Sequence, residues 1–380
     1  MNEICSSTKC TGCGACANIC AHKCIKMLDV GDFGHVMPVI DQSKCVHCGL
    51  CSKICPQNNK KLGYNLPVHV YAAWAKDELD YRSSTSGAAS SVFANEILSH
   101  DGVVYGAAVD NDLRTKHIRI DSSDNVNKIK GSKYVQSYID ENLFCQVLRD
   151  LKLNKQVVFF GTPCQVDGLK FFLRKDFDNL FLIDIVCHGV PSWKLFKEHI
   201  CEIENKQEIG EIDNYSFRNN GSYILNLYKN KRVVYQSTPY KDFYYYGFLK
   251  RVFFREACYS CPYAKSKRIS DITIGDFWGI KGVRLDVKPQ GGLSLIMINS
   301  EKGERLFNNS KTQLYHEERT LSEAVAGNKQ LRHPSKRNRN YKRFKALYQE
   351  MGFETSMKKT FSHDIRIQRM ITHFLKLIYG

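Results

Sequence analysis

Two short cysteine runs near the start of the chain have the residue type and the spacing of metal ligands. The first run, CTGCGACANIC, spans Cys10–Cys20, and the second, CVHCGLCSKIC, spans Cys45–Cys55. Both follow the pattern C-x2-C-x2-C-x3-C, and Gly14 and Gly49 occupy matching places in them. The repeat predicts two similar metal sites related by an internal duplication, unless the same cysteines are the disulfide framework of a small secreted fold.

The spacing is that of bacterial ferredoxins, in which three close thiolates bind one [4Fe–4S] cluster and the fourth cysteine reaches the other cluster. This rule assigns the first cluster to Cys10, Cys13, Cys16 and Cys55. It assigns the second cluster to Cys45, Cys48, Cys51 and Cys20. A four-thiolate zinc site is the alternative, but a third closely spaced cysteine is more than tetrahedral zinc requires. Neither cluster has an open position for substrate, so the pair predicts an electron relay whose chemistry lies further along the chain.

The length and the cysteine usage favour metal ligands over disulfides. At 380 residues the chain can form one large or two modest domains with real cores, so disulfides are not needed for stability. The sequence shows no secretory leader pattern and no run of about 18 apolar residues, so we expect a cytoplasmic protein without a transmembrane segment. In a reducing compartment, the 16 cysteines are expected as ligands.

The chain is basic, with 55 Lys and Arg against 39 Asp and Glu and a formal net charge of +16. Such an excess favours acidic partners, which include a phosphorylated ligand, an anionic lipid and an acidic electron-carrier protein. A solvated basic face is the other interpretation. Nucleic acid is not expected as a partner, because the sequence contains no recognisable binding module for it.

The remainder of the chain predicts an α/β fold, with a mixed sheet and flanking helices, behind the small ferredoxin module. Strand-like runs such as VHVYAAWA, QVVFFG, LFLIDIV and LSLIMIN alternate with helical patterns at Ala88–Leu98 and Ser192–Asn205. We expect three parts: a two-cluster ferredoxin domain at 1–62, a body at 63–330 and a basic helical extension at 331–380. The extension ends in an amphipathic pattern from Ile367 to Ile378, which predicts packing on the body, docking to a partner or contact with a membrane surface.

Four further cysteines in the body predict another metal site. Cys164 and Cys187 directly follow apolar strands, at the edge where open α/β sheets place their sites. Cys258 and Cys261 form a C-x2-C pair. Together they supply enough thiolates for a third [4Fe–4S] cluster or a structural zinc, whereas separate buried thiols are the alternative. His188, next to Cys187, is either an acid–base group or a hydrogen-bonded structural histidine.

Two other stretches are suited to an anionic ligand. RSSTSGAASSVF, at Arg82–Phe93, places hydroxyls and a glycine just before a helical pattern. The free N–H groups of such a helix start can hold a dinucleotide pyrophosphate or the polar edge of a flavin, although an ordinary N-cap is the alternative. KGSKYVQS, at Lys130–Ser137, adds two lysines beside a glycine turn.

The motifs of the body together resemble the coenzyme F420 hydrogenase/dehydrogenase beta-subunit family. The stretches that carry the resemblance are STSGAA, KGSKYVQS, GTPCQVDGLK, CHGVPS and CPYAKSKRISDITIGDFWG, which run in this order from about Arg82 to Gly279. The fused N-terminal ferredoxin is similar to the input subunits of F420H2 dehydrogenases and to bacterial homologues associated with surface-polysaccharide synthesis.

The resemblance implies that the body carries FAD and one [4Fe–4S] cluster. It implies that the ligands of this cluster are Cys164, Cys187, Cys258 and Cys261. It also implies that the STSG helix start, Lys133 and the GTPCQ loop lie near the flavin. The residues that we expect to bind the flavin are Ser84, Thr85, Ser86, Gly87, Lys133, Thr162 and Gln165.

These parts predict an iron–sulfur flavoprotein oxidoreductase that relays electrons between a ferredoxin-like or flavodoxin-like carrier, or coenzyme F420, and a substrate. A flavin exchanges single electrons with clusters and hydride with organic carriers, so it would connect the relay to the substrate. A ferredoxin-dependent bacterial reductase of a metabolite or sugar intermediate in surface-polysaccharide synthesis is one alternative. A non-enzymatic electron-transfer subunit of a larger complex is another. The sequence singles out no catalytic residue.

Overall fold

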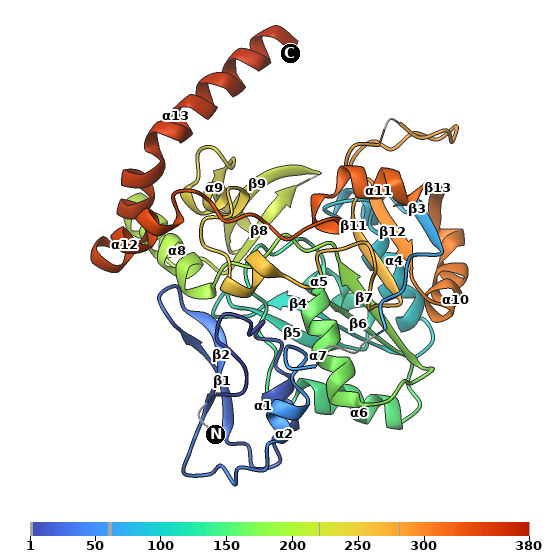
Figure 1. The fold of residues 1–380 in the computed structure, drawn as a ribbon. Coiled ribbons are helices and arrows are strands. Elements are labelled where there is room, and N and C mark those ends of the chain that lie inside the picture. The colour runs from blue at the N-terminus through green and yellow to red at the C-terminus, as the bar shows by residue number, and fades with distance from the viewer. Residues whose placement is uncertain (1–2, 60–62, 220, 281, 380) are drawn as a thin grey trace.

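The computed structural model describes residues 3–59, 63–219, 221–280 and 282–379, and its body is built on a mixed sheet (Figure 1). The eight strands of this sheet lie in the order β13-β3-β12-β11-β7-β6-β4-β5. Strands β4, β6, β7 and β11 pair in parallel, and the other pairings are antiparallel. The strands are β3 (His69–Ala75), β4 (Val103–Val109), β5 (Thr115–Ile120), β6 (Val157–Gly161), β7 (Leu180–Ile185), β11 (Ile272–Asp276), β12 (Ser294–Ile298) and β13 (Leu314–Glu318). The predicted mixed α/β fold is confirmed.

Helices cover both faces of the sheet, which explains why its central strands are continuous apolar runs. Successive residues of each strand point to opposite faces. Val158 packs with α4 (Ala89–Leu98) and α10 (Glu301–Ser310), whereas Val157 and Phe159 pack with α6 (Leu143–Lys152) and α7 (Pro163–Leu173). Short elements complete the body: α3 (Glu78–Arg82), η1 (Ser123–Asn125), α5 (Val126–Ile129), η2 (Glu256–Ser260), η3 (Lys311–Gln313), α11 (Leu321–Gly327) and η4 (Lys329–Leu331).

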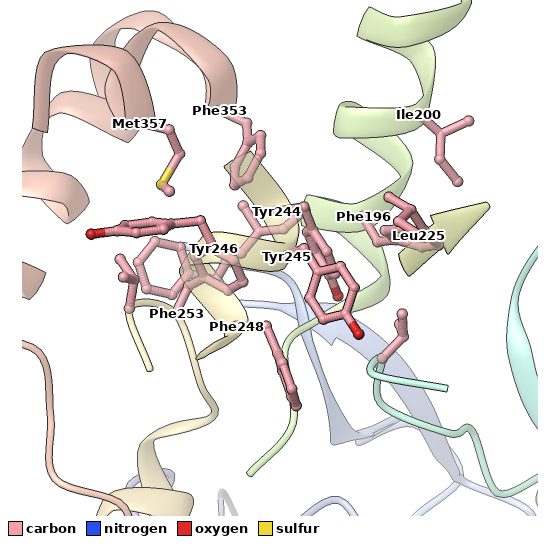
Figure 2. Close-up of a cluster of buried hydrophobic side chains, with 14 of the residues drawn as sticks. Phe196, Ile200, Leu225, Tyr244, Tyr245, Tyr246, Phe248, Phe253, Phe353 and Met357 are labelled. Atoms are coloured by element: carbon pink, nitrogen blue, oxygen red, sulfur yellow. The ribbon is translucent and has the colours of Figure 1, made fainter. Parts of the chain in front are cut away.

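A second, strongly aromatic core lies beside the sheet (Figure 2). Its elements are a three-stranded sheet of β8 (Asn214–Asn219), β9 (Ser222–Lys229) and β10 (Arg232–Ser237), with α8 (Trp193–Gln207), α9 (Phe243–Leu249), α12 (Tyr341–Met351) and α13 (Phe353–Tyr379). Phe353 and Met357 at the start of α13 are buried there beside Tyr244 and Phe253. The C-terminal region is therefore helical, as expected, and part of it completes a core.

The later part of α13 extends away from the body (Figure 1), whereas its start is buried in the aromatic core. Ile367 and Met370 are 36% and 58% exposed. The other apolar residues of the predicted stripe, Ile371, Phe374, Leu375 and Ile378, lie outside the residues whose side chains are described. None of the helices described is long and apolar enough to cross a lipid bilayer.

The N-terminal module is docked on the body by both of its halves. It contains α1 (Ala15–Ile19), the antiparallel hairpin β1 (Ile25–Val30) and β2 (His35–Ile40), and α2 (Leu50–Lys53). Phe33, in the hairpin turn, inserts into the aromatic core, where its ring centroid lies 5.7 Å from that of Phe344 and 5.5 Å from that of Tyr348. At the other end of the module, Asn18 donates to the Asp140 carbonyl at 2.8 Å. The module is thus held in a fixed orientation.

Candidate functional site

Four thiols from the two N-terminal runs converge in the interior of the module. Cys10, Cys13, Cys16 and Cys55 are each only 7% or 8% exposed. Burial raises the pKa of the Cys16 thiol well above its usual range, and the nearby charges of the other three thiols add to the rise. The backbone N–H groups of Gly12, Ala15 and Ala17 donate to the thiols of this group. The structure therefore brings Cys55 to the first run, as the spacing rule predicts. We call these residues the inner set.

The other four thiols lie nearer the surface of the module. Burial raises the pKa of Cys51, and the nearby charges of Cys48 and Cys20 contribute to that rise, so Cys20 has crossed to the second run. Cys48 is exposed, and Cys20, Cys45 and Cys51 are partly exposed. We call Cys20, Cys45, Cys48 and Cys51 the outer set.

Two cysteines outside the predicted ligands also lie beside these sets. The Sγ of the buried Cys24 is 3.3 Å from the Sγ of Cys20. Hydrogen bonds with Cys10 and Cys55 raise the pKa of Cys5. The position of Cys24, four residues after Cys20, is the one sequence feature that points to this proximity, and nothing comparable marks Cys5.

The four cysteines of the body line one cavity of about 360 Å³. Cys164 lies in the first turn of α7, directly after β6, and Cys187 follows β7, which pairs with β6. Cys258 lies in η2, and Cys261 is its C-cap. Burial raises the pKa of Cys187 well above its usual range, and the charges of Cys258, Cys164 and Cys261 contribute to the rise. The four residues, which we call the cavity set, are therefore close neighbours.

The donor chemistry of all three sets suits iron–sulfur clusters, because four thiols in each set can hold the four corners of a cubane. Among the described residues, no three His, Cys, Asp or Glu side chains are placed to hold a single metal ion. Thiolates that share one zinc must come within about 4.6 Å of one another, which is twice the Zn–S bond length. Thiolates at the corners of a cubane stand further apart.

The same cavity collects six of the seven residues that the resemblance assigns to a flavin. Its lining includes Ser84, Thr85, Ser86, Lys133, Thr162 and Gln165. Gly87 has another role, because a Cβ at this position would lie 2.1 Å from the Ala73 carbonyl oxygen. Gly87 therefore allows the loop to pack closely on β3. Its carbonyl accepts a hydrogen bond from the N–H of Ala75 in that strand.

The start of α4 is open on the side of the cavity. Its N-cap is Ala88, with a left-handed φ of 63°, and no side chain caps it. The ordinary N-cap that the serines and threonine of RSSTSG also suggested is thus not formed. Ala88, Ala89 and Ser90 line the cavity, which places the positive end of the helix dipole next to it, although the Ala89 N–H already donates to the Ser294 hydroxyl at 3.4 Å.

Lys133 and the start of α7 supply further polar groups. The Nζ of Lys133 donates to the Lys130 carbonyl at 2.6 Å, and burial lowers the pKa of Lys133 to about 7. Thr162 and Gln165 form a capping box at the start of α7, and the Gln165 amide also donates to the Ser137 carbonyl at 3.1 Å. These two side chains therefore hold the Cys164 turn in place.

Sequence reasoning missed two arginines that line or approach the cavity. Arg218 forms an ion pair with Asp276 at 2.9 Å and lies over the ring of Tyr223 at 4.2 Å. It also donates to the Thr85 carbonyl at 2.9 Å, so it connects the β8–β9 hairpin to the STSG loop. Arg255 lies between the cavity set and the inner set. Neither arginine lies in a stretch whose spacing identified it, and only the tertiary fold brings them here.

The histidines near the cavity differ in their environments. His117 is buried with both ring nitrogens engaged, since Nε2 donates to the Phe160 carbonyl at 2.8 Å and Nδ1 accepts from Ser137 at 2.6 Å. Burial lowers the pKa of His117 to about 4. His188 lines the cavity, and burial lowers its pKa as well. Both rings are therefore neutral near pH 7.

Two family models match the chain, and each covers a different part of it. Residues 9–59 match the 4Fe-4S dicluster domain. Residues 154–324 match the model for the C terminus of the coenzyme F420 hydrogenase/dehydrogenase beta subunit. These residues carry a domain of that beta-subunit family. The predicted resemblance and the predicted N-terminal clusters are thus confirmed, and the chain is an iron–sulfur protein of oxidoreductase type related to F420 hydrogenase beta subunits.

The beta-subunit match includes the cavity set and the GTPCQ loop, but it begins after the STSG and KGSKYVQS stretches. Among solved structures, the chain is similar to one in the F420-reducing [NiFe] hydrogenase complex of Methanosarcina barkeri, studied as a xenon derivative. The two share 15% identity over 79% of this chain and 94% of that one, with a TM-score of 0.48. No curated protein matches the sequence.

Helix α7 joins the inner set to the cavity set. It carries Cys164 in its first turn, and Gly168, one turn later, faces the first cysteine run. A Cβ at Gly168 would lie 2.9 Å from both the Cβ and the Sγ of Cys13. Real Cβ atoms do not approach this closely, so α7 and the ligand loop pack at a distance that only glycine permits.

We therefore expect Gly168→Val to lower the iron content, with a loss of about four irons per chain from the inner set. The branched side chain would displace Cys13, whose sulfur cannot shift once it is bound to iron. Iron analysis of anaerobically purified protein measures the effect. Gly63→Val is the matched control, because no atom of the described residues lies within 4 Å of a Cβ at Gly63. Full iron content in Gly168→Val would contradict the contact.

Proposed function

We propose that the chain is an iron–sulfur flavoprotein oxidoreductase in which electrons pass between the outer set, the inner set, the cavity set and a flavin in the cavity. The observation that carries the proposal is the shared lining of the cavity. The cavity set, the uncapped start of α4 and Lys133 all face the same space, and α7 connects this space to the inner set. A metal site for single electrons and a site for an anionic organic cofactor are thus neighbours.

The residues around the cavity fit a flavin nucleotide. The volume of the cavity, about 360 Å³, lies in the range of small-molecule sites. It opens at the carboxyl ends of β6, β7 and β11, where open α/β sheets bind ligands. The N-terminal end of α4 and the ammonium group of Lys133 suit a pyrophosphate. When bound, the flavin would supply exchange between single electrons and a hydride or electron pair.

The outer set is the point in the chain that best suits contact with an electron-carrier protein. Cys48 is exposed, and the surface around it contains the exposed Lys44 and Lys53 and the 58% exposed side chain of Val46. A mixed apolar and basic surface next to a cluster suits an acidic partner such as a ferredoxin or flavodoxin. The family name points to coenzyme F420 as a second carrier, which would reach the cavity.

Two alternatives to this proposal can be distinguished by experiment. A ferredoxin-dependent reductase of a metabolite or sugar intermediate would turn over its substrate with reduced ferredoxin and without coenzyme F420. A non-enzymatic electron-transfer subunit would bind clusters and flavin but show no turnover alone with either carrier. Screening reduced ferredoxin, F420H2 and NAD(P)H against soluble acceptors separates these cases.

We expect anaerobically purified protein to contain about 12 irons and one flavin per chain. The double variant Cys258→Ser/Cys261→Ser should then retain about eight irons, because only the cavity set loses ligands. Iron, zinc and flavin analyses with visible spectra before and after dithionite measure these values. Cys201→Ser, which changes a thiol in α8, is the control. About eight irons, one zinc and no flavin in the unmodified protein would overturn the proposal.

We expect the affinity of the flavin-free protein for FAD to fall as the pH rises above about 7. Burial lowers the pKa of Lys133 to about 7, so in the flavin-free protein its side chain is charged below this pH and neutral above it. Above this pH the side chain must therefore take up a proton before it can pair with the anionic pyrophosphate. The loss is at most tenfold per pH unit, and the FAD pyrophosphate does not change charge between pH 6 and 9. Lys133→Met should bind weakly with a flat profile, whereas Lys116→Met, at an exposed ion pair, should match the unmodified protein. If the FAD affinity of the unmodified protein does not change with pH, Lys133 does not contact the flavin.

We expect Lys53→Glu to raise the KM for reduced ferredoxin several-fold at low salt, because it places a negative charge beside the outer set. The effect should fade as salt screens the charges. Steady-state reduction of the clusters by reduced ferredoxin measures it. Lys152→Glu makes the same charge change at an exposed lysine at the end of α6 and should leave the KM unaltered. Equal effects from both variants would contradict docking at the outer set.

A further inference from the structure

Arg255 connects the N-terminal module to the cavity set through an unusual group of contacts. Its side chain is buried, with a residue exposure of 2%. Nη1 donates to the carbonyl of Cys10 at 2.9 Å, and Nη2 donates to Gln136 Oε1 at 3.0 Å and to the carbonyl of Val36. Arg255 also precedes Cys258 by one turn of chain, and it lines the cavity. One guanidinium thus lies between two sets of thiols.

The ligand loop of the inner set is shaped to admit this side chain. Gly12, between Cys10 and Cys13, has a left-handed φ of 66°. A Cβ at Gly12 would lie 2.7 Å from Nη2 of Arg255 and 2.7 Å from the amide nitrogen of Gln136. Gly12 is therefore required both by the backbone conformation and by the close approach of the guanidinium.

The charge of Arg255 has no counter-ion among the described residues. None of the ion pairs found among the described residues includes Arg255, and its oxygen acceptors are all neutral. The thiol of Cys10 is an ionisable group to which its side chain is hydrogen-bonded. Its Nε is buried without a hydrogen-bond partner. A buried unpaired cation is strongly unfavourable in a protein interior. An anionic group is therefore expected next to it.

The thiols of the inner set and of the cavity set lie beside this charge. On the side of the cavity set, Arg255 lines the same cavity as the four thiols of that set, and the Cys258 N–H donates to the Arg255 carbonyl at 2.9 Å. On the side of the inner set, its guanidinium is hydrogen-bonded to Cys10. His35, which also lies near Arg255, is neutral, since burial lowers its pKa to about 3. A cubane held by four thiolates is anionic, so a cluster in each set would supply the missing negative charge.

We propose that Arg255 is the shared counter-ion of the inner and cavity clusters and a positioning residue that raises the reduction potential of both relative to the outer cluster. The proposal rests on the cluster in the cavity set that the proposed function includes. Each cluster gains one negative charge on reduction, and a fixed cation in a poorly screened interior stabilises that reduced state. Within the described residues the outer set has no such buried cation, so electrons received there would move inward with a favourable change in potential.

The test is an EPR-monitored potentiometric titration of the full chain with its clusters bound. We expect Arg255→Gln to shift the midpoint potentials of two clusters to more negative values and to leave that of the outer cluster unchanged. The outer cluster is identified as the one whose signal is altered in Cys48→Ser. It also serves as a reference within every sample.

A second variant tests the charge without removal of the arginine. Gln136→Glu keeps the side-chain shape and places a carboxylate on Nη2 of Arg255, so it should shift the same two potentials in the same direction. Arg255→Lys keeps the charge and loses the forked contacts, so its shift should be smaller than that of Arg255→Gln. Arg319→Gln, at partly buried ion pairs with Glu317 and Glu323 outside the cavity, is the control and should shift none.

The outcomes separate this inference from the function on which it rests. About 12 irons per chain with unchanged potentials in both Arg255→Gln and Gln136→Glu would overturn the role of Arg255 and leave the relay intact. About eight irons in the unmodified protein would overturn the cavity cluster itself, whatever the potentials of the other two. Loss of iron in Arg255→Gln with a clear shift in Gln136→Glu would support the charge role and show that the contacts to Cys10 also hold the loop.

Discussion

The close packing of α7 on the first cysteine run is the contact on which the rest of the arrangement depends. The helix starts at β6 with Cys164 in its first turn, and Gly168 brings the next turn against Cys13. A larger residue would separate the two by several tenths of an ångström or more. Because electron transfer weakens steeply with distance, a module that was docked less closely would be a poor relay into the cavity. The hairpin anchor at Phe33 and the contacts of Asn18 fix the orientation in which this packing occurs.

The topology of the sheet explains why the cavity set assembles from distant parts of the chain. Strands β6 and β7 are parallel neighbours, so the residues that follow them emerge at the same edge. Cys164 and Cys187 are therefore brought together by the sheet alone. Cys258 and Cys261 arrive from the segment before β11, which pairs with β7 on its other side. The chain returns to the same edge, and Arg255 enters with it.

The sequence could predict what depends on local spacing or strand order. The two ferredoxin runs, the mixed sheet and the position of Cys164 after an apolar strand follow from patterns within short windows. Contacts between distant segments could not be predicted in this way. The meeting of Arg218 with Asp276, the packing of Phe33 on α12 and the proximity of Cys24 to Cys20 each depend on how the segments pack. The uncapped start of α4 is a similar case, because serines and threonines there suggested a cap that the left-handed Ala88 does not form.

The three cysteine sets differ in their exposure, and the inner set is the most buried of them. The outer set is partly open to solvent, the inner set is buried, and the cavity set faces a space that also collects the polar groups of α4 and Lys133. In the proposed relay, the exposure of Cys48 would let a large carrier protein approach the outer set, whereas the partly exposed cavity set would be reached by a small molecule through the cavity. The body of the chain brings a buried cation without a carboxylate partner, Arg255, between the inner set and the cavity set. Since reduction adds negative charge, placing buried cations at one end of a chain of redox sites favours the movement of electrons toward that end.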